Sequence, residues 1–400
     1  MQQDSDFQGR VSFLCGDGQV VALSGRTPVL PACSELVLSF FDALSRTLMS
    51  SREARAYPDV VTWAFWIRRA SLEKAARRIS KDARIRVGRG FALHIAPSNV
   101  PVNFAVSMTS SLLAGNITAV RVPSRGFEQV RIICDAINSV LGSGFEAMRP
   151  YLAVMRYAHD DAINASLSSM CDLRVVWGGD ATVAAFRAIA IPPRAIEMDF
   201  PDRHSLCVVD SSEYLKMDPS QVASLFYTDT YYSDQNACSS PRAVIWLGSG
   251  REEARERFYK ALHDLVLKRY AMQPIQAVDK LNAFCELAAA GFRPLRAGSD
   301  NLLWRIEGCR ADAHLMDFKQ PGGYFFDIDA SSLEDALPLM DKRCQTVSCI
   351  GVDPAEVARM AAAHGARGVD RVVAVGHTMD LSFTWDGFGM IESMSRIIDA

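Results

Sequence analysis

The sequence predicts an α/β protein with two domains, each built on a parallel β-sheet. From Arg89 onward, short apolar segments alternate with longer amphipathic segments, which is the pattern of strands joined by crossover helices. A second series of the same kind begins near Arg203. The chain has 400 residues, 49% of them hydrophobic and 22% charged, so it is long enough to form two or three domains with sizeable cores.

The N-terminal half is expected to begin with two helices and to continue as a strand–helix series. Ser34 is suited to cap a helix over 34–50, and Pro58 stands in the first turn of a helix over 58–80. Further elements follow from the apolar periodicity: strands over 91–96, 117–122, 152–157 and 173–177, and helices over 104–113 and 127–141.

The C-terminal half repeats this alternation around a loop that carries a cysteine. The expected strands are 205–209, 243–247, 323–327, 344–351 and 371–375, and the expected helices are 221–232, 251–270, 332–340 and 354–364. Trp385-Asp386-Gly387 is expected to close a turn near the chain end. These elements place the domain boundaries at 1–200, 201–376 and 377–400.

Composition excludes several classes of function. A net charge of −3 without any long Lys/Arg block argues against nucleic acid as a partner. The polar, acidic segment Met1–Asp6 differs from a signal peptide, and no apolar run is long enough to span a bilayer. The ten cysteines show no Cys-x-x-Cys pair or zinc-finger spacing, so we expect free thiols, no metal site and a reducing cytoplasm.

One cysteine stands out because of its surroundings. The segment 231–242 reads Tyr-Tyr-Ser-Asp-Gln-Asn-Ala-Cys-Ser-Ser-Pro-Arg, which places Cys238 in a polar, turn-forming run. A presented thiolate could take an acyl group from a thioester and hold it while a second reagent acts. The alternative is an ordinary thiol without a chemical role.

Three loops after expected strands carry polar residues, and ligands bind outside the carboxyl ends of such strands. Asn99, between two prolines, could donate to an oxyanion or could merely cap the next helix. Arg121 could bind a nucleotide phosphate or lie in a solvated turn. The pair Gly178-Gly179 would allow a ligand to approach the backbone, although this signal alone is weak.

In their order along the chain these motifs resemble a known family. Pro-Ser-Asn-Val-Pro at 97–101, Arg-Val-Pro-Ser at 121–124, Trp-Gly-Gly-Asp at 177–180 and Gln-Asn-Ala-Cys-Ser-Ser-Pro at 235–241 resemble the aldehyde dehydrogenase superfamily. Within it, the segments around Tyr57, Phe65, Cys344 and Trp385 are most similar to LuxC-type acyl-CoA reductases. The resemblance runs from about Leu36 to the C-terminus. It implies an aldehyde-dehydrogenase-like fold of two Rossmann-like domains and a C-terminal return or oligomerisation segment.

The resemblance also implies roles for individual residues. Cys238 would be the acyl-accepting nucleophile, and Asn99 with the backbone N–H of Cys238 would form the oxyanion hole. Arg121 stands where the superfamily often has a lysine near the adenosine ribose, and a guanidinium there favours NADPH over NADH. The residues expected to bind the cofactor are Ser98, Arg121, Pro123, Ser124, Gly178, Gly179 and Asp180.

The same resemblance suggests partners for the chain. The substrate would be an acyl-CoA or an acylated protein, and a synthetase or other acyl-transferring subunit would be a partner. Members of the superfamily usually associate through the segment at the chain end, so a homo-oligomer is expected.

One departure from the superfamily pattern favours reduction. Hydrolytic aldehyde dehydrogenases carry a water-activating glutamate in a Glu-Leu-Gly-Gly segment, whereas this chain reads Glu-Met-Asp-Phe-Pro at 197–201, with Met198 at the position of the base. Glu197, Asp199 and His204 remain candidate proton donors, and we include His204 among the catalytic candidates. The prediction is an NADPH-dependent acyl-CoA reductase. The alternatives are a hydrolytic aldehyde dehydrogenase and a non-catalytic, acyl-binding partner subunit.

Overall fold

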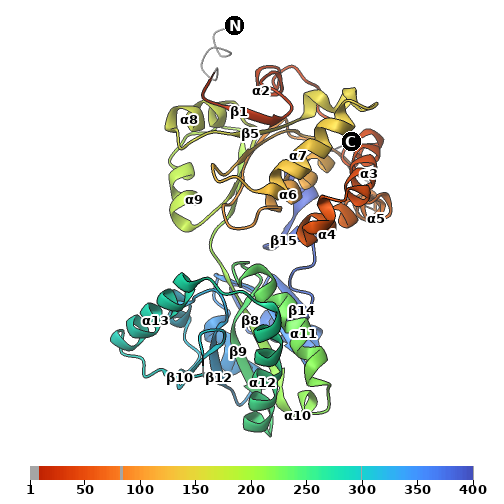
Figure 1. Ribbon diagram of the computed structural model, residues 1–400. Helices are drawn as coiled ribbons and strands as arrows, with labels where there is room; N and C mark the ends of the chain where they lie inside the picture. The colour runs from red at the N-terminus through yellow and green to blue at the C-terminus, as the bar shows by residue number, and fades with distance from the viewer. Residues whose placement is uncertain (1–8, 82–83, 299, 400) are drawn as a thin grey trace. The chain divides into compact units, whose positions relative to one another are not determined.

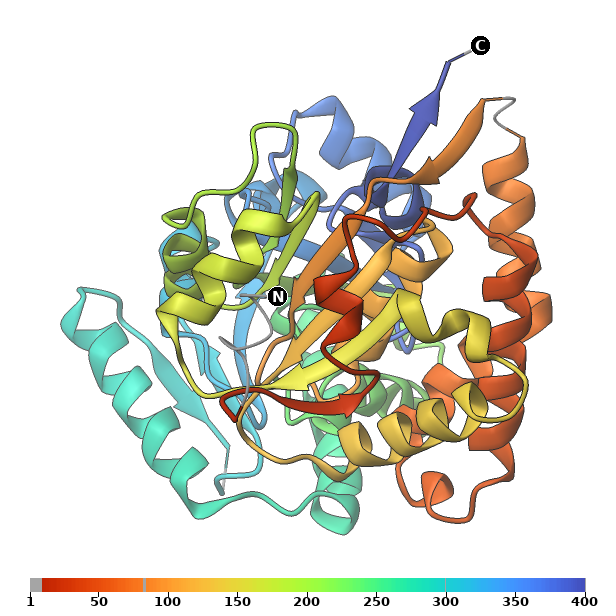
Figure 2. The same ribbon diagram turned by 90° about the horizontal axis from the view of Figure 1, so that it is seen from above.

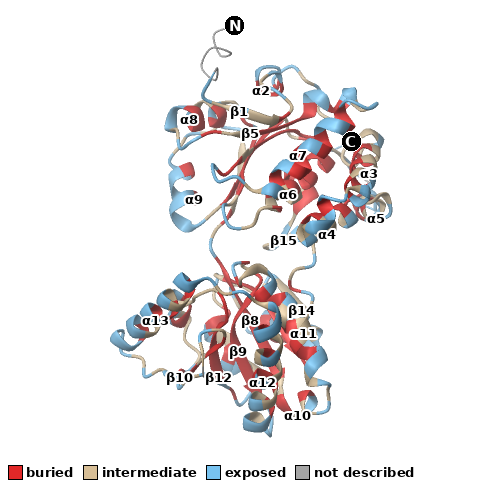
Figure 3. Cartoon of the chain, in the orientation of Figure 1, coloured by how far each residue is buried: buried red, intermediate tan, exposed pale blue. Residues whose placement is uncertain are grey.

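The computed structural model describes residues 9–81, 84–298 and 300–399, so the segment Met1–Asp6 lies outside the described residues (Figure 1). The chain divides into two compact units. Unit 1 contains Met1–Pro201 together with Leu381–Ala400, and unit 2 contains Asp202–Asp380. Each unit is a β-sheet covered by helices, with buried residues in the sheet and exposed residues on the outer helix faces (Figure 3). The predicted α/β class with two parallel sheets is confirmed.

Unit 1 has a six-stranded sheet that is parallel except for one edge strand. The strand order is β1 (Ser12–Cys15), β5 (Leu152–Arg156), β4 (Ile117–Val122), β3 (Phe91–Ile95), β6 (Leu173–Trp177) and β7 (Ile196–Phe200). After the edge strand β1, the parallel strands start in the middle at β3, continue outward through β4 and β5, and then cross back to β6 and β7. The strand order therefore reverses between β3 and β6, where ligands bind in sheets of this kind.

Helices cover both faces of this sheet (Figures 1 and 2). On one face lie α6 (Asn103–Leu113) and α7 (Glu128–Leu141), with α3 (Glu35–Ser50) packed on α7, and on the other lie α8 (Asp161–Met170) and α9 (Asp180–Arg187). The short helix α2 (Gln19–Ala22) precedes them. The strands β3, β4 and β6 are almost wholly buried, as expected for a parallel sheet with two covered faces.

The helix expected over 58–80 is two helices, α4 (Pro58–Trp66) and α5 (Arg69–Ser80). Arg68 between them has extended backbone with φ −61° and ψ 148°. The backbone N–H of Arg69 then finds an acceptor in the Asp42 carboxylate on α3, at 3.3 Å. This tertiary hydrogen bond satisfies a backbone donor in the first turn of α5. The periodicity of the sequence alone could not reveal such a contact.

The C-terminal segment belongs to unit 1. Strands β15 (Thr384–Trp385) and β16 (Phe388–Gly389) form a hairpin whose two turn residues, Asp386 and Gly387, have φ 46° and 76°. Two positive φ angles fit the two-residue turn that Asp-Gly favours, so the predicted turn is confirmed. Helix α15 (Met390–Met394) follows, and β17 (Ser395–Ile398) pairs with β2 (Ile85–Gly88).

Unit 2 has a seven-stranded sheet in which only one edge strand is antiparallel. The order is β10 (Leu295–Ala297), β11 (Trp304–Glu307), β12 (Tyr324–Asp329), β9 (Pro241–Leu247), β8 (His204–Asp210), β13 (Cys344–Ile350) and β14 (Arg371–Ala374). Side chains alternate between two cores along the central strands. On β8, Leu206 and Val208 enter one core, and Cys207 and Val209 enter the other.

The helices of unit 2 cover these two cores. Helices α11 (Pro219–Asp229) and α12 (Arg251–Arg269) pack on one face, and α13 (Pro274–Ala289) and α14 (Pro354–Ala363) pack on the other. The short helix α10 is Ser211–Tyr214. The helix expected over 332–340 is a 3-10 helix, Leu333–Leu339, which contains Pro338 and therefore lacks a backbone donor there. Among the described residues, no helix has the length and apolarity that crossing a membrane requires.

Candidate active site

Cys238 lies on a loop at the amino end of β9, between a 3-10 turn (Tyr231–Ser233) and the strand. Cys238 forms no disulfide bond and is half-buried. Asp234 and Gln235 both have left-handed backbone, with φ 52° and 59°, and this reverses the chain before the cysteine. Because the central strands of unit 2 are parallel, the cysteine loop sits at the edge of the sheet where those strands begin.

The buried side chain of Gln235 holds this loop to the neighbouring strand. Its Nε2 donates to the carbonyl oxygens of Pro241 at 2.8 Å and Tyr324 at 3.2 Å. Its Oε1 accepts from the backbone N–H groups of Gly323 at 2.8 Å and Tyr324 at 3.2 Å. The amide thus uses its donor and acceptor sides together, which explains why a polar residue is retained at a fully buried position.

Other contacts hold the loop from β8 and from the segment before β12. The Ser205 hydroxyl donates to the carbonyl oxygen of Cys238 at 2.7 Å. The Gly322 N–H donates to the carbonyl of Asp234 at 2.9 Å. Gly323 has φ 88°, and a Cβ there would lie 2.2 Å from the Tyr231 hydroxyl oxygen, so only glycine fits this close approach.

A buried lysine supports the same segment from α13. The Nζ of Lys280 donates to the carbonyl oxygens of Gly322 and, at 2.7 Å, Asn301. Burial lowers the pKa of Lys280 to about 8. The lysine is therefore part of the support under the cysteine loop.

The segment 376–380 also lies beside the loop. The buried carboxylate of Asp229, at the end of α11, accepts from the N–H groups of Gly376 at 2.7 Å and Thr378 at 3.0 Å. Burial raises the pKa of Asp229 to about 6, and the two backbone donors act in the opposite direction. The Ser239 hydroxyl lies 3.5 Å from the sulfur of Met379. The end of α11, which precedes the cysteine loop, and the segment 376–380 beside the loop are thus both fixed by tertiary contacts.

In unit 1 the residues expected to serve the oxyanion and the cofactor gather at the carboxyl edge of the sheet. Ser98 and Asn99 are exposed on the loop after β3. Helix α6 begins after Val102 without any side-chain cap, so Asn99 is not the cap of that helix.

Arg121 lies on the next strand, at the end of β4. Its guanidinium is 5.4 Å from the centre of the Tyr157 ring, and its Nη2 is 3.5 Å from the Tyr157 carbonyl. Its Nε is buried without a hydrogen-bond partner, and no carboxylate in the described part of the chain pairs with it. Pro123 is buried and Ser124 is exposed directly after the strand. A half-exposed guanidinium without a carboxylate partner is suited to a phosphate.

The third group of candidates follows β6. A Cβ on Gly178 would lie 2.9 Å from the side chain of Thr182, so glycine allows the first turn of α9 to pack tightly. Gly179 caps α9, is exposed, and has open space at its α-carbon, and Asp180 begins the helix. Exposed backbone next to β3 and an Arg121 guanidinium without a carboxylate partner in the described chain together fit a dinucleotide at this edge of the sheet.

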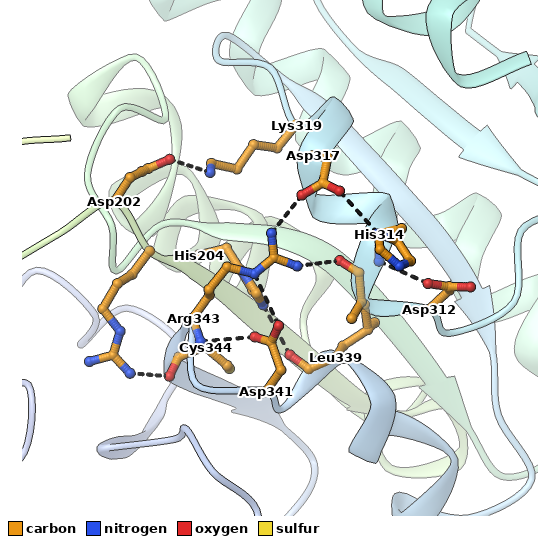
Figure 4. A network of polar contacts seen from close by, with 12 residues as sticks. Asp202, His204, Asp312, His314, Asp317, Lys319, Leu339, Asp341, Arg343 and Cys344 are labelled. Carbon is orange, nitrogen blue, oxygen red and sulfur yellow. Dashed lines mark hydrogen bonds and ion pairs between the residues drawn. The ribbon is translucent and has the colours of Figure 1, made fainter. Parts of the chain in front are cut away.

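His204 is the first residue of β8, and its side chain is buried inside unit 2 (Figure 4). Its Nε2 lies 3.0 Å from the carbonyl of Leu339, close to the ion pair between Arg343 and Asp341. Burial lowers the pKa of His204 to about 4, so the ring is neutral at pH 7. This environment favours a structural role, and His204 has no place in the mechanism that we propose.

The segment expected to replace the hydrolytic base is strand β7. Met198 is buried in the core of unit 1, with 3% of its surface exposed. Glu197 pairs with the buried Arg174, and Asp199 accepts from Arg187 at 2.6 Å. The side chains of Met198, Glu197 and Asp199 are therefore all held by contacts within unit 1.

Two groups escaped the sequence analysis. Gln235 was part of a recognised motif, but its support of the loop depends on strand β12, almost ninety residues later. In unit 1, His94 on β3 is fully buried, with Nδ1 2.7 Å from the Ser107 hydroxyl, which also accepts from Trp177 Nε1 at 2.9 Å. No cluster of three His, Cys, Asp or Glu side chains within the described ranges could hold a metal ion.

Comparison with known proteins gives one family and one fold. The family described as acyl-CoA reductase (LuxC) matches residues 45–397, and no curated protein matches the chain. A benzaldehyde dehydrogenase from Corynebacterium glutamicum, described as NAD-dependent, has a TM-score of 0.64 at 12% identity, with 97% of this chain and 94% of that chain covered.

Two further solved structures are similar. Aldehyde dehydrogenase 21 from Physcomitrella patens has a TM-score of 0.67 at 12% identity, with coverages of 95% and 88%. The bifunctional proline utilization A protein has a TM-score of 0.65 at 16% identity; 93% of this chain is covered, and it spans 41% of that longer chain. These likenesses confirm the predicted aldehyde-dehydrogenase-like fold.

Proposed function

The chain belongs to the acyl-CoA reductase (LuxC) family, and from this membership we propose that it reduces an acyl thioester to an aldehyde with NADPH. The observation that carries the proposal is Cys238, a half-buried cysteine outside any disulfide, on a loop that Gln235, Ser205 and Gly322 hold in place. The proposed substrate is an acyl-CoA, with an acylated protein as the second donor class. A synthetase subunit and a homo-oligomer are proposed partners on the strength of the family resemblance.

In the proposed mechanism the Cys238 thiolate attacks the thioester carbonyl. A carbon–sulfur bond to Cys238 forms, the bond to the CoA sulfur breaks, and CoA leaves as a thiolate. Asn99 and the backbone N–H of Cys238 donate to the oxygen on which negative charge develops. Reduction of the acyl-cysteine gives a thiohemiacetal. Its collapse releases the aldehyde and regenerates the Cys238 thiolate.

The nicotinamide, when bound, supplies the hydride that this reduction needs. We propose that Arg121 and Ser124 after β4, Ser98 after β3, and Gly178 to Asp180 after β6 hold the cofactor, with Pro123 shaping the turn. The guanidinium of Arg121 pairs with no carboxylate in the described chain, and this supports a preference for the 2′-phosphate of NADPH.

The surroundings of β7 support reduction over hydrolysis. A hydrolytic enzyme must activate a water molecule against the acyl-cysteine. Met198 cannot accept a proton, and the neighbouring Glu197 and Asp199 are held by arginines. An acyl-cysteine without such a base survives until hydride transfer.

The proposal is tested by mixing the purified protein with NADPH and acyl-CoA of short, medium and long chain. We expect loss of NADPH absorbance with formation of equimolar aldehyde and free CoA. An acyl carrier protein bearing the same acyl group separates the two donor classes. If NADPH is not oxidised with any acyl donor, the reductase function is wrong. Oxidation of aldehydes to acids without CoA would favour the hydrolytic alternative.

Replacing Arg121 with alanine is expected to raise the KM for NADPH by roughly tenfold to a hundredfold, because a charge-assisted contact to phosphate is worth about 1.5–3 kcal/mol. The KM for NADH should change little, since NADH lacks the 2′-phosphate. Steady-state kinetics with both cofactors measure this difference.

Arg125 gives a matched control for the charge. It is exposed on the loop that follows β4 and lies 5.0 Å from the Phe127 ring, so Arg125→Ala should leave both KM values near those of the wild type. A wild-type enzyme that uses NADH much better than NADPH would contradict the role of Arg121.

A further inference from the structure

Arg242, the second residue of β9, carries a buried positive charge without a carboxylate partner. It is 6% exposed, its Nη1 donates to the carbonyl of Gln320 at 2.6 Å, and its Nε is buried without an acceptor. Two other described arginines are more than nine-tenths buried. Arg174 pairs with Glu197 and Arg203 pairs with Asp370, whereas no described carboxylate lies within ion-pair distance of Arg242.

A buried cation without a counter-charge is costly, so its retention needs an explanation. Arg242 follows Cys238 by four residues, and the turn between them is closed by a hydrogen bond from Ser240 N–H to the Ala237 carbonyl at 3.0 Å. Negative charge on Cys238, and then on Asp202, favours the charged form of the guanidinium and opposes the effect of burial, which lowers the pKa of Arg242 to about 10. The thiolate of Cys238, four residues before Arg242 and across this closed turn, is thus a candidate for the missing counter-charge.

No helix connected to the cysteine loop supplies a positive end. Helix α11 ends at Asp229, so it presents the negative end of its dipole toward the loop. The next helix, α12, begins at Arg251, beyond the opposite end of β9. A charged side chain is therefore the remaining source of positive potential on this part of the chain.

We infer that Arg242 is a positioning residue that holds Cys238 in its thiolate form for acyl transfer. The role in acyl transfer rests on the proposed function, but the ionisation of the thiol does not. At pH 7 to 8 the guanidinium is below its pKa of about 10 and therefore charged, so it stabilises the thiolate without itself gaining or losing a proton. The carbonyl of Gln320 fixes the direction of the guanidinium.

Other ionisable groups around the loop are already engaged. Asp202 pairs with Lys319 at 2.6 Å, as Figure 4 shows, and His377 pairs with Asp380 at 2.8 Å. Asp229 is held by two backbone donors, and the side chain of Asp234 is hydrogen-bonded to Tyr270. Two other cations beside the loop, Lys280 and Arg371, also form no ion pair within the described chain, and backbone carbonyls hold them. Arg242 differs from them in its place four residues after Cys238, across a closed turn.

The test is the pH dependence of Cys238 alkylation by iodoacetamide, followed by mass spectrometry of the peptide that contains Cys238. In the wild type we expect the alkylation midpoint to lie below that of Cys285, an exposed thiol on α13 that serves as the internal reference. Arg242→Gln should raise the midpoint by about one pH unit or more, and so slow alkylation at pH 7 about tenfold. Above the new midpoint the rates should converge. Arg242→Lys should retain most of the effect.

Two results would overturn the inference. One is a wild-type midpoint for Cys238 equal to or above that of Cys285, which is decisive even if Arg242→Gln does not fold. The other is an unchanged midpoint in a folded Arg242→Gln variant. Arg257→Gln, which removes another carbonyl-bound guanidinium of unit 2, is the matched control and should not move the midpoint. Alkylation needs neither acyl-CoA nor NADPH, so its outcome is independent of the reductase assay.

Discussion

Replacing Cys238 with alanine is expected to abolish both acyl labelling and NADPH-dependent reduction, with turnover falling by at least about a thousandfold. The proposed acyl transfer has no other acceptor, and the loop keeps its contacts through Gln235 and Ser205, which do not involve the thiol. Incubation with radiolabelled acyl-CoA measures labelling, and the NADPH assay measures turnover.

Cys285→Ala is the matched control because Cys285 is exposed on α13 and has no role in the proposed mechanism. This variant should label and turn over like the wild type. Turnover that survives in Cys238→Ala would reject Cys238 as the nucleophile. Labelling that moves to Cys285 would indicate nonspecific acylation.

Acid is expected to destabilise unit 1 through His94. Burial lowers the pKa of His94 to about 3, against 6.5 for an unperturbed histidine. Between pH 3 and 6.5, His94 is protonated in the unfolded chain but neutral in the folded chain. Its contribution to the free energy of unfolding is therefore fully present above pH 6.5 and is lost as the pH falls toward 3. Each unit of pKa shift corresponds to about 1.4 kcal/mol, so the full loss in the free energy of unfolding is on the order of 5 kcal/mol.

Hydrogen exchange of the β3 and β6 amides, corrected for intrinsic exchange rates, measures this loss locally. His94→Gln cannot titrate and should show a shallower fall in protection between pH 6.5 and 4, whatever its stability at pH 7. His159→Gln is the control because His159 is exposed, with 80% of its side chain accessible. Equal slopes in wild type and His94→Gln would contradict the prediction. His204, also buried with a lowered pKa, should act in the same direction on unit 2.

The sequence was sufficient for features that depend on local patterns. Buried strands such as Leu173–Trp177 are short apolar runs, and the Asp386-Gly387 turn follows from residues that tolerate positive φ. Strands β1, β2, β7, β10, β11 and β15 to β17 were not predicted. All except β11 lie at sheet edges or in two-stranded sheets, where half-exposed residues leave little apolar contrast, and β11 is only four residues long.

The candidate site was predictable only in part. The motifs identified which loops carry polar groups, because strand ends and glycines are visible in the sequence. They could not show that the cysteine loop lies at the amino edge of its sheet, since that follows from the pairing of β8, β9 and β12. Nor could they show that His204 is buried against Leu339, 135 residues away. Long-range pairing decides these points.

The chain enters unit 2 at Asp202 and leaves it at Asp380, so unit 1 is assembled from two pieces that are far apart in sequence. The second piece supplies buried side chains, Met390, Ile391 and Met394, and a carbonyl at Met394 that accepts from Asn116 at 3.0 Å. During synthesis, unit 2 can therefore close its core as soon as it emerges from the ribosome, whereas unit 1, although its larger piece is made first, must wait for the segment that begins at Leu381. Nascent unit 1 is the part of the protein exposed longest to chaperones and proteases.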